Sequence, residues 1–179
     1  MAEPNWVDLR AIQVVVAELE KTGWKASPHA NHNEPGSDIL AQKGSASILV
    51  EVKARTTGPA SGLRSVGVEA KARQQATDDR IFYVSQKQSG TAHAFVVIFF
   101  DSREDPGDWI VLLARDLPGF RTAGATSRMD GKTPHYVRRS WLRSGERPQW
   151  RTRPRMDLTP LCGTSGFRRL DLLVGGNPL

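Results

Sequence analysis

Residues 35–53 read Pro-Gly-Ser-Asp-Ile-Leu-Ala-Gln-Lys-Gly-Ser-Ala-Ser-Ile-Leu-Val-Glu-Val-Lys. Two short runs rich in strand-forming residues, 38–42 and 48–54, flank Lys-Gly-Ser at 43–45. A pair of such runs joined by a few residues that include glycine is typical of a β-hairpin. This stretch therefore predicts two antiparallel strands, and the rest of the chain is interpreted around them.

Charged and apolar residues alternate at the end of the second predicted strand. Side chains two residues apart in a strand share a face, so Glu51 and Lys53 should point one way while Val50 and Val52 face the core. If the hairpin pairs near its turn, Asp38 at the start of the first strand lies opposite the end of the second. Two carboxylates and one ammonium group are then expected to meet at one point.

Oxygen ligands of this kind suit Mg²⁺ or Mn²⁺, which keep several waters and take phosphate oxygens as further ligands. We expect Asp38 and Glu51 to bind the ion, with the backbone carbonyl of Val52 as a third ligand. Lys53 would position the attacking water and stabilise charge that develops on a phosphate. Each signal taken alone has a structural alternative, which is a solvated salt bridge for Glu51 with Lys53 and a turn or capping role for Asp38.

The motif resembles that of the PD-(D/E)XK nuclease superfamily, which includes restriction enzymes, Holliday-junction resolvases and many repair nucleases. The resemblance rests on Gly-Ser-Asp-Ile at 36–39, twelve residues between Asp38 and Glu51, and Val-Glu-Val-Lys at 50–53. It extends over roughly residues 6–100. It implies an α/β fold with a mixed central sheet flanked by helices, in the restriction-endonuclease-like order helix, three strands, helix, strand. It also implies a Mg²⁺-dependent endonuclease acting on DNA, with Asp38, Glu51 and Lys53 as active-site positions.

Two accessory positions of this family are less well matched here. Many members have a glutamate in the first helix, and its place falls near Ile12 or Gln13. Glu18 could replace it if the helix is rotated. Some members also have a glutamine on the helix after the motif, which Gln74 or Gln75 could supply.

Periodicity predicts the elements around the hairpin. Apolar residues at spacings of three and four indicate an amphipathic helix over 6–21, and good helix formers indicate a polar helix over 68–79. Residues 81–84 could continue that helix or begin a strand, and we favour continuation. The unbroken β-branched and aromatic run 94–100 predicts a buried central strand, and 109–114 predicts a strand antiparallel to it.

Positive charge is concentrated towards the C-terminus. The formal net charge is +6 and the pI is about 9.9, which favours a polyanionic partner. Residues 132–155 contain eight basic residues and one acidic residue. We expect either a nucleic-acid-binding arm or a solvated basic face. The candidate contacts, including two from the loop that follows Lys53, are Arg55, Arg64, Arg138, Arg139, Arg143, Arg151, Arg153 and Arg155, and Tyr136, Trp141 and Trp150 lie among them.

Length and composition limit the class of protein. At 179 residues, with 39% hydrophobic and 25% charged residues, we expect a single domain with a catalytic core over 6–115 and a basic C-terminal extension over 120–179. The single cysteine excludes an internal disulfide. Without a long apolar run or a signal-peptide pattern, we expect a cytoplasmic protein that does not interact with membranes.

Three questions about function stay open at this level. The alternative to a nuclease is a catalytically weak or inactive DNA-binding module of the same fold, or a subunit that supplies DNA contacts to a larger defence or repair complex. DNA is preferred to RNA through the resemblance alone. A homodimer is expected if both strands of a duplex are cut.

Overall fold

The computed structural model describes residues 6–29, 37–56, 79–101, 106–121, 131–150 and 152–175. The first half comprises α1 (Trp6–Lys21), β1 (Lys25–Pro28), β2 (Ile39–Lys43), β3 (Ala46–Thr56), β4 (Asp79–Val84), α3 (Gln86–Thr91) and β5 (Ala94–Phe100). The second half comprises β6 (Pro106–Leu113), the 3₁₀ helix Ala114–Phe120, β7 (Thr133–Arg138), α4 (Arg139–Ser144), β8 (Glu146–Arg147), β9 (Met156–Asp157), the 3₁₀ helix Thr159–Leu161, α5 (Gly163–Arg168) and the 3₁₀ helix Arg169–Leu173.

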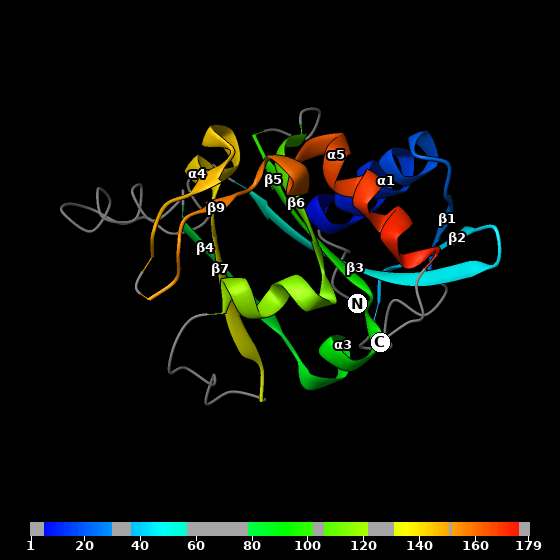
Figure 1. Cartoon of the computed structure of the whole chain (residues 1–179). Coiled ribbons are helices and arrows are strands. Elements are labelled where there is room, and N and C mark those ends of the chain that lie inside the picture. Colours follow the sequence, from blue (N-terminus) through cyan, green and yellow to red (C-terminus); the bar gives the residue numbers. More distant parts are fainter. Residues whose placement is uncertain are drawn as a thin grey trace.

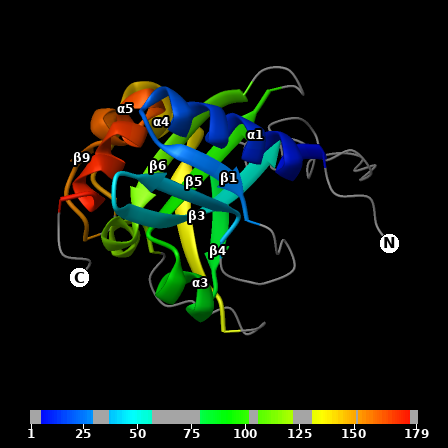
Figure 2. The same ribbon diagram turned by 90° about the vertical axis from the view of Figure 1, so that its right-hand side faces the viewer.

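A five-stranded mixed sheet lies at the centre, with the strand order β1-β2-β3-β5-β6 (Figure 1). Strands β3 and β5 are parallel, and the other neighbours are antiparallel. Helices α1 and α5 pack on one face of this sheet, while the two-stranded sheet of β4 and β7 and helix α4 cover the other (Figures 1 and 2). The expected α/β fold with a mixed, helix-flanked central sheet is confirmed.

Strand β5 is buried along its whole length, as its apolar run predicted. Phe95, Val97 and Phe99 face the cluster that contains β4, β7 and α4. Ala94 and Val96 face the opposite cluster, which contains α1 and α5. A strand that is covered on both faces needs apolar residues at every position, which explains why this run shows no alternation.

The predicted hairpin forms from β2 and β3. Its register runs from Lys43 opposite Ala46 to Ile39 opposite Val50, and Gly44 adopts a positive φ of 60° in the turn. Strand β3 continues to Thr56, whereas β2 pairs with it only as far as Val50. Beyond Val50, no strand of the described part of the chain pairs with the edge of β3 that faces β2.

Residues 81–84 were predicted to continue a helix, and this prediction is wrong. They belong to β4, which pairs antiparallel with β7. Phe82 and Val84 are buried while Tyr83 between them is 43% exposed, which is the two-residue alternation of a strand. The preceding helix predicted over 68–79 lies outside the described residues except for its last position.

The C-terminal part of the chain contributes to the same core as the N-terminal part. Val137 and Trp141 pack with Phe95, and Phe167 and Leu170 pack in the cluster that contains α1. Among the described residues, segments before and after 115–120 therefore share the same core clusters. Within the described ranges, no helix is both long and apolar enough to cross a membrane.

Candidate active site

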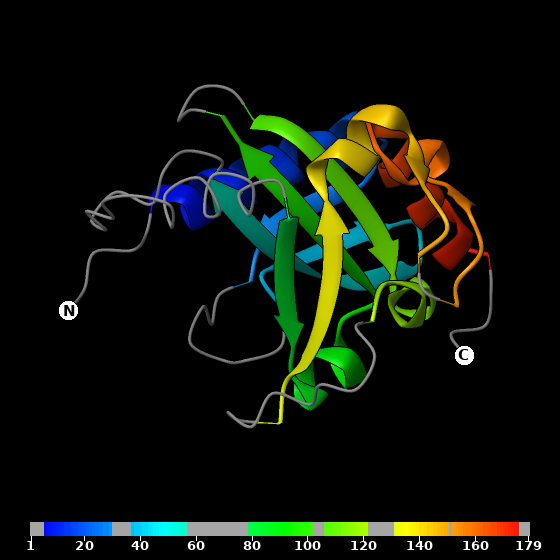
Figure 3. The same cartoon turned by 90° about the vertical axis from the view of Figure 1, so that its left-hand side faces the viewer.

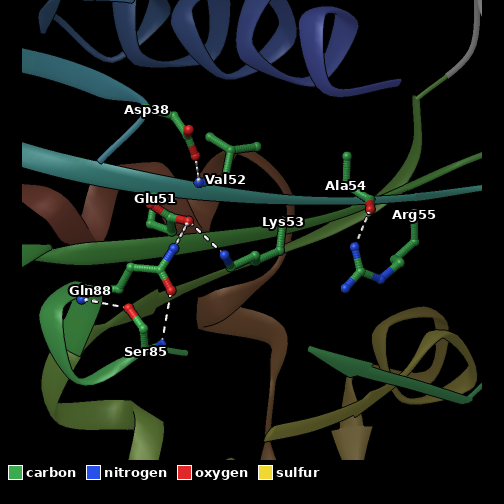
Figure 4. Close-up of polar contacts among 8 residues, drawn as sticks. All are labelled: Asp38, Glu51, Val52, Lys53, Ala54, Arg55, Ser85 and Gln88. Carbon is green, nitrogen blue, oxygen red and sulfur yellow. Dashed lines mark hydrogen bonds and ion pairs between the residues drawn. The ribbon is translucent and has the colours of Figure 1, made fainter. Parts of the chain in front are cut away.

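Asp38 occupies the position where β2 would otherwise continue along β3. Its backbone N–H donates to the carbonyl of Val50 at 3.0 Å. Its Oδ2 accepts the N–H of Val52 at 2.7 Å (Figure 4). The side chain thus takes the place of the next strand partner. The N–H and C=O of one strand residue point towards the same edge, so the carbonyl of Val52 is directed to the side where Asp38 lies.

Glu51 and Lys53 share a face of β3, as the alternation predicted. The Nζ of Lys53 donates to Oε1 of Glu51 at 2.6 Å, and the two side chains are 17% and 6% exposed, respectively. This ion pair is largely shielded from water, so the solvated salt bridge considered as an alternative does not describe it. A buried charge with too few partners is costly, so the carboxylate of Glu51 needs further hydrogen-bond donors.

Gln88 is such a partner, and sequence reasoning missed it. Its Nε2 donates to Oε1 of Glu51 at 2.5 Å (Figure 4). The same side chain closes the capping box of α3, because its Oε1 accepts the N–H of Ser85 while the Ser85 hydroxyl accepts the N–H of Gln88. The Ser-x-x-Gln spacing signals a helix start in sequence, but nothing local indicates that its glutamine reaches Glu51.

Asp8 is a third carboxylate that sequence reasoning missed. It lies in the first turn of α1 and lines the same cleft as Asp38 and Glu51, together with Leu9 and Ile12. The family resemblance placed a helix carboxylate near Ile12, and Asp8 lies one helical turn before that position. Desolvation raises the pKa of Asp8, with a further upward contribution from Asp38.

The electrostatic environment of Glu51 opposes its ionisation. Burial raises the pKa of this carboxyl, the Lys53 ammonium partly counteracts the rise, and the negative charge of Asp38 adds to it. A desolvated carboxylate near a second negative charge gains stability when a cation joins it. This is the electrostatic setting of a divalent-cation site.

These residues line one cleft of about 670 Å³. It contains the carboxylates of Asp8, Asp38 and Glu51, the cations Lys53, Arg55 and Lys132, and the polar side chains of Tyr83, Ser85 and Gln88. Among the residues that the structure describes, no three His, Cys, Asp or Glu side chains are grouped closely enough to hold a metal ion by themselves, so a bound ion would need backbone, water or phosphate oxygens as well. An open donor set fits Mg²⁺, which binds through one or two carboxylates and keeps water and phosphate in its other positions.

The accessory positions predicted in the first helix do not reach this cleft. The carboxylate of Glu18 contacts Lys21 and accepts a hydrogen bond from Thr164 at 3.1 Å, because this turn of α1 packs towards α5. Gln13 is exposed and accepts a hydrogen bond from Arg10 at 3.3 Å. The predicted positions outside the described residues are Gln74, Gln75, Arg64 and Arg151.

Arg139 was expected to contact nucleic acid, and the structure buries it instead. It is 4% exposed, and its guanidinium binds both carboxylate oxygens of Asp101, at 2.5 and 2.6 Å, and Oδ2 of Asp108 at 2.5 Å. The hydrogen bonds to Asp101 raise its pKa further above the usual range. Arg139 therefore joins α4 to the β5–β6 hairpin.

The other described arginines of this region differ in their availability. Arg143 pairs with Asp108 at 3.1 Å, Arg155 pairs with Glu146, and Arg153 donates to the carbonyl of Gly119 at 2.8 Å. Arg138, Arg143 and Arg155 are exposed, and Arg55 lines the cleft. The basic C-terminal region thus contributes apolar residues to the core, and some of its arginines present charge at the surface.

No family model and no curated protein sequence matches the chain. Among solved structures, it is similar to Hjc, a Holliday junction resolvase of the archaeal hyperthermophile Archaeoglobus fulgidus. The identity is 17% and the TM-score 0.39, over 76% of this chain and 87% of that chain. A likeness of this size supports no transfer of activity from the resolvase, so the chemistry has to follow from the cleft itself.

Proposed function

We propose that this protein is a metal-dependent nuclease that hydrolyses phosphodiester bonds of DNA. The observation that carries the proposal is the convergence of Asp38, Glu51 and Lys53 in one cleft, at the point where β3 continues beyond β2. A phosphate at this open sheet edge could be contacted from one side by two carboxylates, a strand carbonyl and an ammonium group. The motif whose spacing resembles that of the PD-(D/E)XK superfamily therefore lies in a cleft that could hold a metal ion and a phosphate.

Asp38, Glu51 and the carbonyl of Val52 would hold Mg²⁺ or Mn²⁺. Asp8 lines the same cleft from α1 and is the candidate for a further oxygen ligand, direct or through water. The bound ion would polarise the scissile phosphate and lower the pKa of a coordinated water. The carboxylates supply the negative charge that keeps such an ion in place.

Lys53 and Gln88 would act on the attacking water and on Glu51, respectively. The ammonium group of Lys53 lies 2.6 Å from Glu51, so it is held beside the proposed metal position. There it would orient the water and stabilise the negative charge that grows on the phosphate oxygens. Gln88 would keep the Glu51 carboxylate in one orientation through its own hydrogen bond.

The cleft also offers cations for the sugar–phosphate backbone. Arg55 and Lys132 line it from two different parts of the chain. Their charges would hold the phosphates on either side of the scissile bond, consistent with the net charge of +6. DNA is preferred to RNA through the sequence resemblance, so both belong in the assay.

Cleavage assays test the proposal. Plasmid and linear DNA, and single-stranded RNA, are incubated with wild-type protein and Mg²⁺ or Mn²⁺, beside Glu51→Ala and Lys53→Ala. We expect cleavage by the wild type and a loss of about 10²-fold or more in each variant. The matched control is Glu20→Ala, since Glu20 is an exposed acidic residue on α1 that does not line the cleft.

A binding module with weak or no catalysis, alone or within a larger complex, is the second candidate. It is favoured by the double engagement of Glu51, whose Oε1 accepts hydrogen bonds from both Lys53 and Gln88. Equal inactivity of wild type and variants on every substrate, together with tight DNA binding, would select it. Light scattering with and without DNA would test the proposed homodimer.

A further inference from the structure

The two-stranded sheet of β4 and β7 has an inner and an outer face (Figure 3). Phe82 and His135 are paired across the strands and stack on the inner face with ring centroids 5.2 Å apart. Because side chains alternate, Tyr83 and its partner Pro134 belong to the outer face, where Tyr83 is exposed and Pro134 is buried. The proposed chemistry uses Lys132, which precedes β7, and gives no role to Tyr83, Tyr136 or Arg138.

One end of the outer face opens into the cleft. Tyr83 is 43% exposed and lines the cleft that contains Glu51. Lys132 directly precedes β7, is exposed, and lines the same cleft. The aromatic ring of Tyr83 and the ammonium group of Lys132 therefore both line the cleft where it meets this two-stranded sheet.

The other end presents an oriented arginine. Tyr136 and Arg138 follow Pro134 along β7 at two-residue intervals, so they lie on the same face. The Nε of Arg138 donates to the hydroxyl of Tyr136 at 2.8 Å, and its guanidinium lies 5.6 Å from the centroid of that ring. Tyr136 in turn stacks on Trp150 at 5.4 Å. Arg138 is exposed yet held in place, so it loses less conformational freedom when it binds an anion.

We propose that this outer face binds a single-stranded segment of nucleic acid that leaves the cleft. We call it the ribbon track, and define it as Tyr83, Lys132, Tyr136 and Arg138. Lys132 and Arg138 would contact phosphates at opposite ends of the track, and Tyr83 would stack on a base. Stacking on a side chain needs an accessible base face, which a single strand offers and a continuous duplex does not.

The dimensions agree with a short single strand. Four residue steps separate Pro134 from Arg138, which is about 13 Å at ~3.3 Å per residue. Stacked nucleotides advance by ~3.4 Å each, so the stretch of the track between Tyr83, the partner of Pro134, and Arg138 would hold about four of them. The inference rests on the proposed function for the position of the scissile bond, and it adds the substrate class: DNA with a single-stranded segment beside the cleavage site.

Binding is measured separately from cleavage to test the track. Full-length Glu51→Gln protein, without divalent cations, is titrated against a labelled blunt duplex and the same duplex with an overhang of about four nucleotides. We expect the overhang substrate to bind about 5-fold tighter or more, a preference that Tyr83→Ala removes and Tyr83→Phe retains. Arg138→Ala should lower the slope of log affinity against log salt by about 0.7.

Arg168→Ala is the matched control, because Arg168 is exposed on α5, across the central sheet from the track. It should leave the overhang preference unchanged. Equal binding of blunt and overhang DNA by the parent protein, or an equal effect of Tyr83→Ala on both, overturns the track. Metal-dependent cleavage without a preference for the overhang would contradict the ribbon track and support the proposed nuclease activity. A preference for the overhang without cleavage would support the ribbon track and contradict the nuclease activity.

Discussion

The side-chain amide of Gln88 donates to Oε1 of Glu51 at 2.5 Å, and its own oxygen accepts the N–H of Ser85 at 2.9 Å. One side chain thus serves both as the N3 residue of a capping box and as the orienter of a buried carboxylate. Helix α3 is only six residues long and buries none of them. Its placement beside β3 therefore couples a helix cap to the proposed metal site.

We predict that Gln88→Ala weakens metal-dependent cleavage by about 10- to 100-fold, the usual effect of losing a residue that orients a metal ligand. The loss should appear mainly as a higher metal concentration for half-maximal activity. Gln86→Ala is the matched control, since Gln86 is an exposed glutamine on the same helix. Unchanged metal dependence in Gln88→Ala would show that Glu51 needs no such support.

The raised pKa of Glu51 predicts a pH-dependent stability. Because burial raises this pKa above the ordinary 4.5, the folded state binds the proton more tightly than the unfolded state. The resulting stabilisation is fully present below pH 4.5 and is lost as pH rises through the folded-state pKa. Glu51→Gln lacks this titration, so urea unfolding should show wild type losing stability relative to the variant as pH increases. A constant difference across the range would contradict the assignment.

Metal binding should reverse this loss. Mg²⁺ that binds only the folded protein stabilises it by about 2.7 kcal/mol at a concentration a hundredfold above its Kd. We expect the increase in Tm to be larger at neutral pH than near pH 4.5, because Glu51 must be ionised to bind the cation. Asp38→Asn should abolish the increase and Glu20→Gln should retain it. An equal increase in both variants would indicate a site elsewhere.

Arg139 and Arg143 allow a buried and an exposed ion pair to be compared on one acceptor, Asp108. Arg139→Ala would remove a buried guanidinium from two partly exposed carboxylates, and we predict a loss of about 1.5–3 kcal/mol in the free energy of unfolding. Arg143, whose side chain is 58% exposed, should cost less than about 1 kcal/mol when changed to Ala. Chemical denaturation of both variants measures this, and equal losses would contradict the structural role of Arg139.

The most local parts of the fold and site could be predicted from the sequence alone. The turn at Gly44 and the alternation around Glu51 were sufficient to predict the hairpin, and its register followed from the short connection. The shared face of Glu51 and Lys53 follows from strand geometry, and the position of Asp38 follows from the register. Seven consecutive apolar residues at 94–100 were sufficient for the buried central strand.

Only the tertiary structure decided the features that depend on segments far apart in sequence. Residues 81–84 form a strand because β7 pairs with them, and Gln88 and Asp8 enter the cleft because α3 and α1 pack beside β3. The charge of Arg139 gave no sign of burial, since its two carboxylate partners lie more than thirty residues away. Backbone periodicity records which face a side chain takes within its own element. Which element it then meets depends on packing across the whole core, which no local pattern contains.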